Sequence, residues 1–246
     1  DNGLNYANLP KGCILFHFYP EGSRTAFEEH LVEAMNYAAD KNKVIKVHFT
    51  ISPEHEAEIK KLFSSLIENY REQGWKFEVG FSFQSPSTDT ASVTMDNKLF
   101  RDEKGKIVFR PGGHGALLKN LNDLKADIVS IKNIDNIVPD HLKVETYNYK
   151  KILGGYLISL QKKVFGFLRK LEREMISESI ITEILEFIKY EFEMDLSKNL
   201  KTKPISDKEK YLFSFLNRPL RVCGMVKKEN HPGGGPFWVK GENGEM

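Results

Sequence analysis

Apolar positions along residues 23–84 alternate between a helical period and a strand period. Residues 23–42 carry them at spacings of three and four, which predicts an amphipathic helix with Ser23 as its N-cap. Residues 43–50 are rich in β-branched side chains and predict a strand. A second helical pattern covers residues 52–74, and residues 75–84 predict the next strand.

Shorter apolar runs continue this alternation as far as residue 142. Residues 91–110 predict short hairpin strands that turn at Asp102 to Gly105, and residues 127–135 predict another buried strand. Strands that alternate with helices are typical of an α/β sheet with right-handed crossover helices. The pattern therefore predicts a mostly parallel, Rossmann-like sheet.

The pattern changes near residue 143. Residues 143–204 contain long helical stretches with apolar stripes and charged outer faces, which predict a helical insertion. Residues 205–246 add a helix and then a strand, and they predict a return to the α/β domain of residues 1–142.

Composition argues against several classes of protein. The 246 residues are 40% apolar, and 36 Lys and Arg against 34 Asp and Glu give a net charge of only +2. The basic residues are interleaved with acidic ones, so nucleic acid is not an expected partner. Apolar runs fall short of the ~20 residues that span a bilayer, so a membrane is not expected. Cys13 and Cys223 lack a CxxC partner, which predicts neither a zinc site nor a disulfide framework and fits a cytoplasmic protein.

The first stretch with candidate chemistry is VFRPGGHGALLKNL, residues 108–121. It joins an apolar run to a helix start, which is where ligands of open α/β sheets bind. Gly112, Gly113 and Gly115 would allow backbone N–H groups to approach a nucleotide closely. His114 is the polar side chain between them. A tight strand-to-helix turn explains the same glycines, so the motif alone leaves both interpretations open.

Asp135 ends the apolar run of residues 127–135. A carboxylate at the end of a strand can hold Mg²⁺ against a phosphate while the ion keeps most of its waters. The alternative is an N-cap for a turn that begins in NIVPDHL. Asp135 by itself does not decide between these roles.

Four further residues are candidates for contact with phosphate or sugar. Lys11 lies in a constrained segment between proline and glycine and could bind phosphate as a point charge; Arg24, at the start of the first predicted helix, is a candidate of the same kind. His231 and Lys240 belong to the glycine-rich stretch HPGGGPFWVKG and are candidates for the sugar and phosphate side. Solvated surface cations and a loop anchored by aromatic residues are the alternatives.

Four short motifs occur in the order and approximate spacing of the UDP-sugar pyrophosphorylases: LPKGCILFH, FEVGFSFQ, RPGGHGALLKNL and IKNIDN. The chain resembles these enzymes over roughly residues 9–140. Nearly the whole chain, including RVCGMVKKENHPGGGPFWV, is similar to a bacterial family described as a domain of unknown function, which looks like a distant relative of these nucleotidyltransferases. The resemblance implies a sheet of the nucleotide-diphospho-sugar transferase type.

The resemblance also implies roles for individual residues. Gly113 and His114 would lie along the nucleoside, Asp135 would hold a catalytic Mg²⁺, and Lys11 would face phosphate. The implied reaction makes a nucleotide-sugar from a sugar 1-phosphate and a nucleoside triphosphate, with UTP favoured. One departure bears on activity: pyrophosphorylases begin with a strand and a glycine-rich, arginine-containing loop that binds the triphosphate, and the residues before Lys11 contain neither. Either that segment is missing from these residues, or the site is degenerate.

Two alternatives to a Mg²⁺-dependent nucleotidyltransferase stay open. A non-catalytic nucleotide-sugar-binding protein would keep the fold without turnover, because a fold does not determine function. A metal-dependent phosphohydrolase would need a second, closely spaced carboxylate or histidine ligand beside Asp135, and the sequence offers none there.

Overall fold

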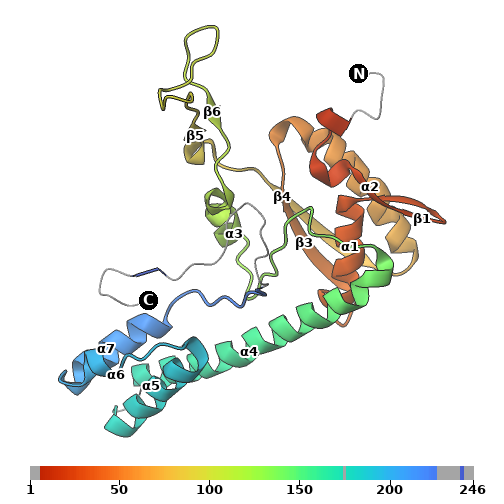
Figure 1. Cartoon of the computed structure of the whole chain (residues 1–246). Coiled ribbons are helices and arrows are strands. Elements are labelled where there is room, and N and C mark those ends of the chain that lie inside the picture. Colours follow the sequence, from red (N-terminus) through yellow and green to blue (C-terminus); the bar gives the residue numbers. More distant parts are fainter. Residues whose placement is uncertain (1–5, 174–175, 226–238, 241–246) are drawn as a thin grey trace. The chain divides into compact units, whose positions relative to one another are not determined.

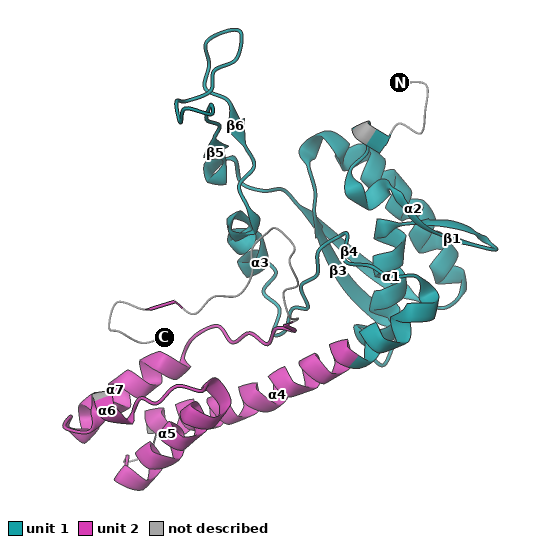
Figure 2. Ribbon diagram, viewed as in Figure 1, with its two compact units in different colours: residues 1–148 teal, residues 149–246 magenta. Residues whose placement is uncertain are grey.

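The computed structural model describes residues 6–173, 176–225 and 239–240. The chain divides into two compact units, residues 1–148 and 149–246 (Figure 2). The described part of the first unit contains strands and helices, and that of the second contains helices. The chain is therefore mixed α/β, whereas a sheet of the nucleotide-diphospho-sugar transferase type stays a prediction.

The first unit begins with a hairpin followed by a helix (Figure 1). β1 (Leu15–Tyr19) pairs antiparallel with β2 (Gly22–Thr25), and α1 (Ala26–Tyr37) follows directly. The N-cap of α1 is Thr25, whose Oγ1 accepts a hydrogen bond from a backbone amide of the first turn at 3.2 Å. The prediction that Ser23 is the cap was wrong, because Ser23 is paired within the hairpin.

The centre of the first unit is a parallel pair of strands joined by a helix. β3 (Val44–Thr50) and β4 (Lys76–Ser82) pair along their whole lengths, and α2 (Glu56–Glu72) connects them. The predicted order of strand, helix and strand is confirmed here. After α2 the chain turns through Gly74, whose φ of 85° is a conformation that glycine adopts at little cost.

Both helices pack on the same face of this strand pair. The ring of Phe27 in α1 lies 4.9 Å from that of Phe49 in β3 and 5.0 Å from that of Phe63 in α2, centroid to centroid. Phe63 in turn meets Phe81 of β4 at 5.3 Å. This aromatic cluster is the core that holds the helices to the strands.

A hairpin arm precedes the glycine loop. β5 (Thr90–Ala91) pairs antiparallel with β6 (Phe109–Arg110), and a bridge joins Arg101 to Ile107 around Gly105, whose φ is 75°. The predicted hairpin with its turn at residues 102–105 is confirmed. The remaining helical elements of the unit are α3 (Leu118–Asp123) and the 3-10 turns Tyr6–Asn8, Lys11–Cys13, Pro53–His55, Pro86–Thr88, His114–Leu117 and Asp140–Leu142.

Residues 127–135 form no strand. The prediction of a buried strand was wrong for this segment, because a strand requires a neighbour for its hydrogen-bond ladder and no other described segment pairs with it. Individual side-chain contacts, rather than a ladder of backbone hydrogen bonds, attach this segment to the rest of the unit. One of them is the Ile134 carbonyl, which accepts a hydrogen bond from Nε2 of His30 at 3.0 Å.

The second unit is built from helices. α4 (Lys143–Arg173) runs across the boundary between the units, followed by α5 (Glu178–Phe192), α6 (Ser197–Leu200) and α7 (Ile205–Leu216). Their apolar side chains form a core separate from that of the first unit. The predicted return of residues 205–246 to the α/β domain does not hold for α7, whose apolar stripe is buried in this helical core; the described residues 217–225 form no strand.

Two findings concern the environment of the chain. Within the ranges that the structure describes, no helix has both the length and the apolar character needed to cross a membrane. Cys13 is partly buried, Cys223 is exposed, and both are free thiols.

Candidate functional site

Lys11 and Asp135 meet at the surface of the first unit. Nζ of Lys11 donates a hydrogen bond to Oδ2 of Asp135 at 2.9 Å, and the two side chains keep 66% and 47% of their exposure. Both were candidates from the sequence, where 124 positions separate them. The structure therefore brings a cation and a carboxylate with predicted roles to one accessible place.

A buried glycine sets the position of Lys11. Gly12, the next residue of the same 3-10 turn, packs directly against the ring of Phe27. A Cβ at this position would lie 2.2 Å from a ring atom, so any side chain would collide with the core. The turn is thus fixed to the core while the Lys11 side chain extends into solvent.

The charge of Asp135 is stabilised by its neighbours. The hydrogen bond from Lys11 holds the pKa of Asp135 below its usual range, and His114 makes a smaller contribution in the same direction. The carboxylate of this accessible pair is therefore ionised at neutral pH.

The glycines of the loop have different structural requirements. A Cβ on Gly112 would lie 2.7 Å from the carbonyl oxygen of Thr88, so packing alone explains this glycine. Gly113 and Gly115 have open space where a side chain would stand, and neither has a positive φ. The tight-turn interpretation therefore accounts for Gly112 but not for the other two, whose backbone is accessible to a ligand.

The remaining candidates are Arg24, Lys240 and His231. Arg24 is engaged within the first unit, since its Nη1 lies 2.8 Å from Oδ2 of Asp140. Lys240 is exposed and belongs to the second unit. His231 lies outside the described residues.

Asp135 offers one carboxylate to a metal ion. Among the residues that the structure describes, no three His, Cys, Asp or Glu side chains are grouped as a metal site. Mg²⁺ that is held mainly through substrate phosphates and water needs only one or two protein carboxylates. Asp135 fits this minimal form, in which a metal ion would compete with the Lys11 ammonium for the same oxygen.

A buried ionic cluster connects α1 to the start of α4, and sequence reasoning missed it. The ammonium of Lys143 and the carboxylate of Glu29 are fully buried and in direct contact. Asp140 accepts hydrogen bonds from Lys143 at 2.7 Å and from Arg24 at 2.8 Å. The Tyr19 hydroxyl donates to Glu29 at 2.6 Å. The cluster therefore joins three segments of the first unit that are distant in sequence.

Hydrogen bonds keep both carboxylates of the cluster ionised. Burial raises the pKa of Glu29, but hydrogen bonds from Lys143, Tyr19 and His17 outweigh burial and hold it below its usual value. Burial likewise raises the pKa of Asp140, and its hydrogen bonds with Lys143 and Arg24 outweigh that effect.

One signal of this cluster was present in the sequence. Glu29 and Glu33 stand four residues apart, so they share one face of the predicted helix, and both are fully buried. Lys132 contacts Glu33 as Lys143 contacts Glu29. Two glutamates on one face of a helix suggest a charged partner, but nothing local identifies lysines more than 90 positions away.

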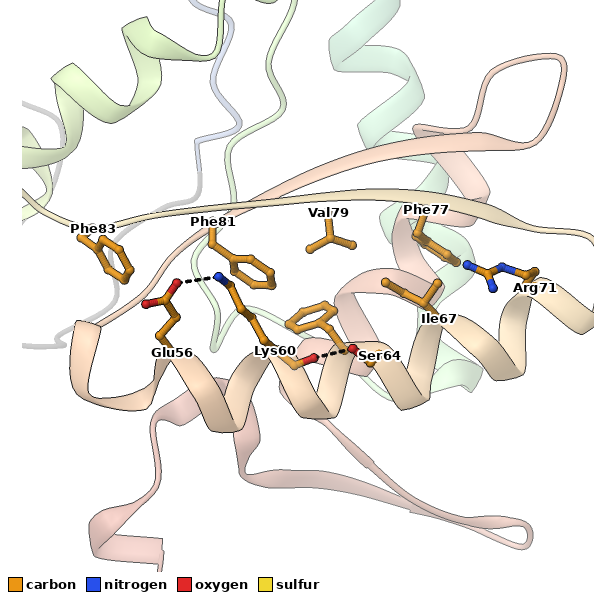
Figure 3. A pocket seen from close by; sticks show the side chains of 10 residues that line it. Glu56, Lys60, Ser64, Ile67, Arg71, Phe77, Val79, Phe81 and Phe83 are labelled. Atoms are coloured by element: carbon orange, nitrogen blue, oxygen red, sulfur yellow. Dashed lines mark hydrogen bonds and ion pairs between the residues drawn. The ribbon is translucent and has the colours of Figure 1, made fainter.

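A cavity of about 590 Å³ lies between α2 and β4 (Figure 3). Phe63, Phe77 and Phe81 line it together with the longer side chains of Lys60 and Arg71. Figure 3 shows the side chains of α2 pointing toward those of β4. None of the residues predicted from the sequence as site residues lines this cavity, so we do not place the functional site there.

No curated protein and no solved structure matches this chain. A family model described as "Domain of unknown function (DUF4301)" matches residues 1–246. The similarity to a family of unknown function is thereby confirmed, whereas the relation to the UDP-sugar pyrophosphorylases stays a prediction. Because the match extends over the whole chain, the protein belongs to the DUF4301 family.

Proposed function

We propose that this protein is a Mg²⁺-dependent nucleotidyltransferase that makes a nucleotide-sugar from a sugar 1-phosphate and a nucleoside triphosphate, with UTP favoured. One observation carries the proposal: Lys11 and Asp135 form an ion pair at an accessible surface. The open backbone of Gly113 and Gly115 flanks His114 in the chain. A lysine, an ionised carboxylate and unobstructed backbone amides are the groups that a triphosphate with a bound metal ion requires.

Each group has a distinct role in this proposal. The amides of Gly113 and Gly115 donate hydrogen bonds to the nucleotide, because no side chain blocks their approach. His114 lies along the nucleoside, and Lys11 contacts phosphate as a point charge. Asp135 would hold Mg²⁺, which when bound neutralises phosphate charge and orients the substrate.

The reaction requires alignment and charge neutralisation rather than a nucleophilic side chain. An oxygen of the sugar 1-phosphate attacks the α-phosphorus of the triphosphate, and the bond to the pyrophosphate leaving group breaks. Lys11 stabilises negative charge on the phosphate oxygens. Its ammonium is paired with Asp135 in the protein alone, so substrate phosphate must replace this carboxylate as its partner.

The second candidate is a nucleotide-sugar-binding protein without turnover. The ion pair itself favours it, because Lys11 and Asp135 satisfy each other without a metal ion or a phosphate.

Pyrophosphate release tests the proposal. The assay combines each nucleoside triphosphate with a panel of sugar 1-phosphates and Mg²⁺, using wild type, Asp135→Asn and Asp96→Asn. Asp96 is the matched control, since it forms an exposed ion pair with Lys98 at 2.8 Å. We expect turnover in wild type and in Asp96→Asn and its loss in Asp135→Asn.

The other outcomes separate the candidates. Normal turnover in Asp135→Asn would reject the metal-binding role of this carboxylate. Calorimetric binding of nucleotide-sugars by a wild type that never releases pyrophosphate would favour the binding protein. A wild type that neither binds nucleotides nor releases pyrophosphate would reject both candidates.

A further inference from the structure

Among the residues that the structure describes, one edge of β4 has no neighbouring strand. The other edge is bonded to β3, where the amide of Lys76 donates to the carbonyl oxygen of Lys43 at 3.0 Å. Backbone groups of successive residues in a strand point to opposite edges, so Phe77, Val79 and Phe81 direct their N–H and C=O groups away from β3. The open edge therefore presents a row of backbone groups to which a further strand can pair.

The side chains of the same three residues are only partly covered. They point toward α2 and line the cavity between α2 and β4, together with Phe83 (Figure 3). Phe77, Val79 and Phe81 are half-buried, and Phe83 is 38% exposed. An apolar row and a row of available backbone groups thus belong to the same residues. One additional strand would cover both.

β4 lacks the features that usually protect an edge strand. Natural edge strands are blunted by proline, by bulges or by being very short. β4 pairs with β3 in regular register along its whole length and contains no proline. Its charged residues, Lys76 and Glu78, alternate with the apolar row and so point to the opposite face of the sheet. The edge is therefore open to a partner strand.

The charges along the cavity favour a second copy of the chain as that partner. Glu56 lies at one end of the row of α2 side chains that lines the cavity, and Arg71 lies at the other end (Figure 3). A twofold axis reverses the direction of this row, so Glu56 of each copy would lie opposite Arg71 of the other. Their partners within α2, Lys60 and Glu68, form exposed ion pairs with them, which are weak. A peptide with a single sign of charge would match only one end of the row.

We propose that two copies of the chain associate through β4, antiparallel across a twofold axis, to form one continuous sheet in the order β3–β4–β4–β3. With Val79 on the axis, Phe77 of each strand faces Phe81 of the other. These three residues then exchange backbone hydrogen bonds in directly opposed pairs. The aromatic pairs continue the apolar row across the axis. On the other face of the sheet, Glu78 lies opposite Gly80 rather than opposite a like charge.

Charge reversal tests the twofold arrangement. Glu56→Arg and Arg71→Glu each place like charges opposite each other, so we expect the dissociation constant of the dimer to rise about tenfold or more in sedimentation equilibrium. The double variant restores opposite charges and should associate as the wild type does. Glu58→Arg is the matched control, since Glu58 is exposed on α2 and does not line the cavity.

A mixture of the single variants gives a sharper result. In a dimer of Glu56→Arg with Arg71→Glu, both contacts join opposite charges, whereas each variant alone opposes like charges twice. Native mass spectrometry of an equimolar mixture should therefore find mixed dimers in preference to either homodimer.

Amide hydrogen exchange, measured by NMR on the whole chain, tests the strand pairing. We expect protection of the amides of Phe77, Val79 and Phe81 to rise as the protein concentration passes through the dissociation constant of the dimer. The amides of Glu78 and Gly80 point toward β3 and should be protected at every concentration. They serve as the internal control.

Several outcomes would overturn the proposal. A chain that stays monomeric at every concentration would do so, as would a dimer that neither charge reversal weakens. A dimer whose open-edge amides in β4 still exchange freely would assign association to another surface. A monomer in which an added peptide of alternating valine and threonine protects these amides would assign the edge to a peptide partner. The interface shares no residue with the Lys11–Asp135 pair, so pyrophosphate release by a strictly monomeric protein would reject it and leave the transferase proposal standing.

Discussion

Nζ of Lys11 lies 2.9 Å from Oδ2 of Asp135, and both side chains remain accessible to water. Exposed ion pairs contribute only about 0–1 kcal/mol to stability, because water screens the attraction and the side chains lose freedom. This pair can therefore be separated by a ligand at little cost. The buried pair of Lys143 and Glu29, in the same unit, has no such freedom.

Substitution of Lys11 by methionine should affect binding far more than stability. We expect the free energy of unfolding to change by less than about 1 kcal/mol, since the pair is exposed. Affinity for nucleoside triphosphate should fall because the point charge is lost. Urea denaturation and titration calorimetry measure the two quantities. A loss of several kcal/mol of stability with unchanged affinity would make Lys11 a structural residue.

Two glycines should respond oppositely to alanine. Gly12→Ala places a Cβ against the Phe27 ring, and such overpacking typically costs about 1–3 kcal/mol. Gly113→Ala meets no neighbour, so its stability should stay within about 0.5 kcal/mol of wild type while nucleotide affinity decreases. Thermal unfolding checks both variants. Equal losses of stability would contradict the open position of Gly113.

Removing charge from the buried cluster should be costly. Glu29→Gln leaves the fully buried ammonium of Lys143 with Asp140 as its remaining carboxylate, and breaking a buried pair typically costs about 3–5 kcal/mol. Glu68→Gln is the control, because Glu68 pairs with Arg71 at 2.8 Å on the exposed side of α2. The free energy of unfolding of this control variant should fall by less than about 1 kcal/mol. Chemical denaturation that finds the two variants alike would show that the cluster is not a stabilising contact.

The same cluster should make the protein sensitive to acid. The pKa values of Glu29 and Asp140 are lower in the folded state than in the unfolded state, where they are about 4. The ionised carboxylates therefore stabilise the fold at pH values above about 4. This stabilisation is lost as the pH falls through the folded-state pKa values. Glu28 opposes this trend, because burial raises its pKa. The free energy of unfolding should therefore fall on acidification below about pH 4.

Asp140→Asn isolates the contribution of one group to this acid sensitivity. The variant lacks a carboxylate with a lowered pKa, so its stability should decline less steeply between about pH 4 and pH 3. Urea denaturation at each pH gives the change in the free energy of unfolding with pH for the variant and for the wild type. Identical slopes would mean that Asp140 does not contribute to the acid sensitivity.

Local sequence patterns were sufficient to predict much of the secondary structure. The strand period in β3 and β4 and the helical period in α2 arise from side chains a few residues apart, which is the range over which helices and strands are stabilised. The turn at Asp102 to Gly105 depends on local conformational preference in the same way. Lys11, His114 and Asp135 could also be identified one at a time, because each stands in a short motif.

Tertiary structure decided what these elements and residues do together. Thr25 rather than Ser23 caps α1 because the hairpin has already paired Ser23. Residues 127–135 are apolar enough for a strand, but only a neighbouring segment could have made them one. The contact between Lys11 and Asp135 joins residues 124 positions apart. Periodicity and local propensity describe near neighbours in sequence, whereas contacts between distant residues depend on how the whole core packs.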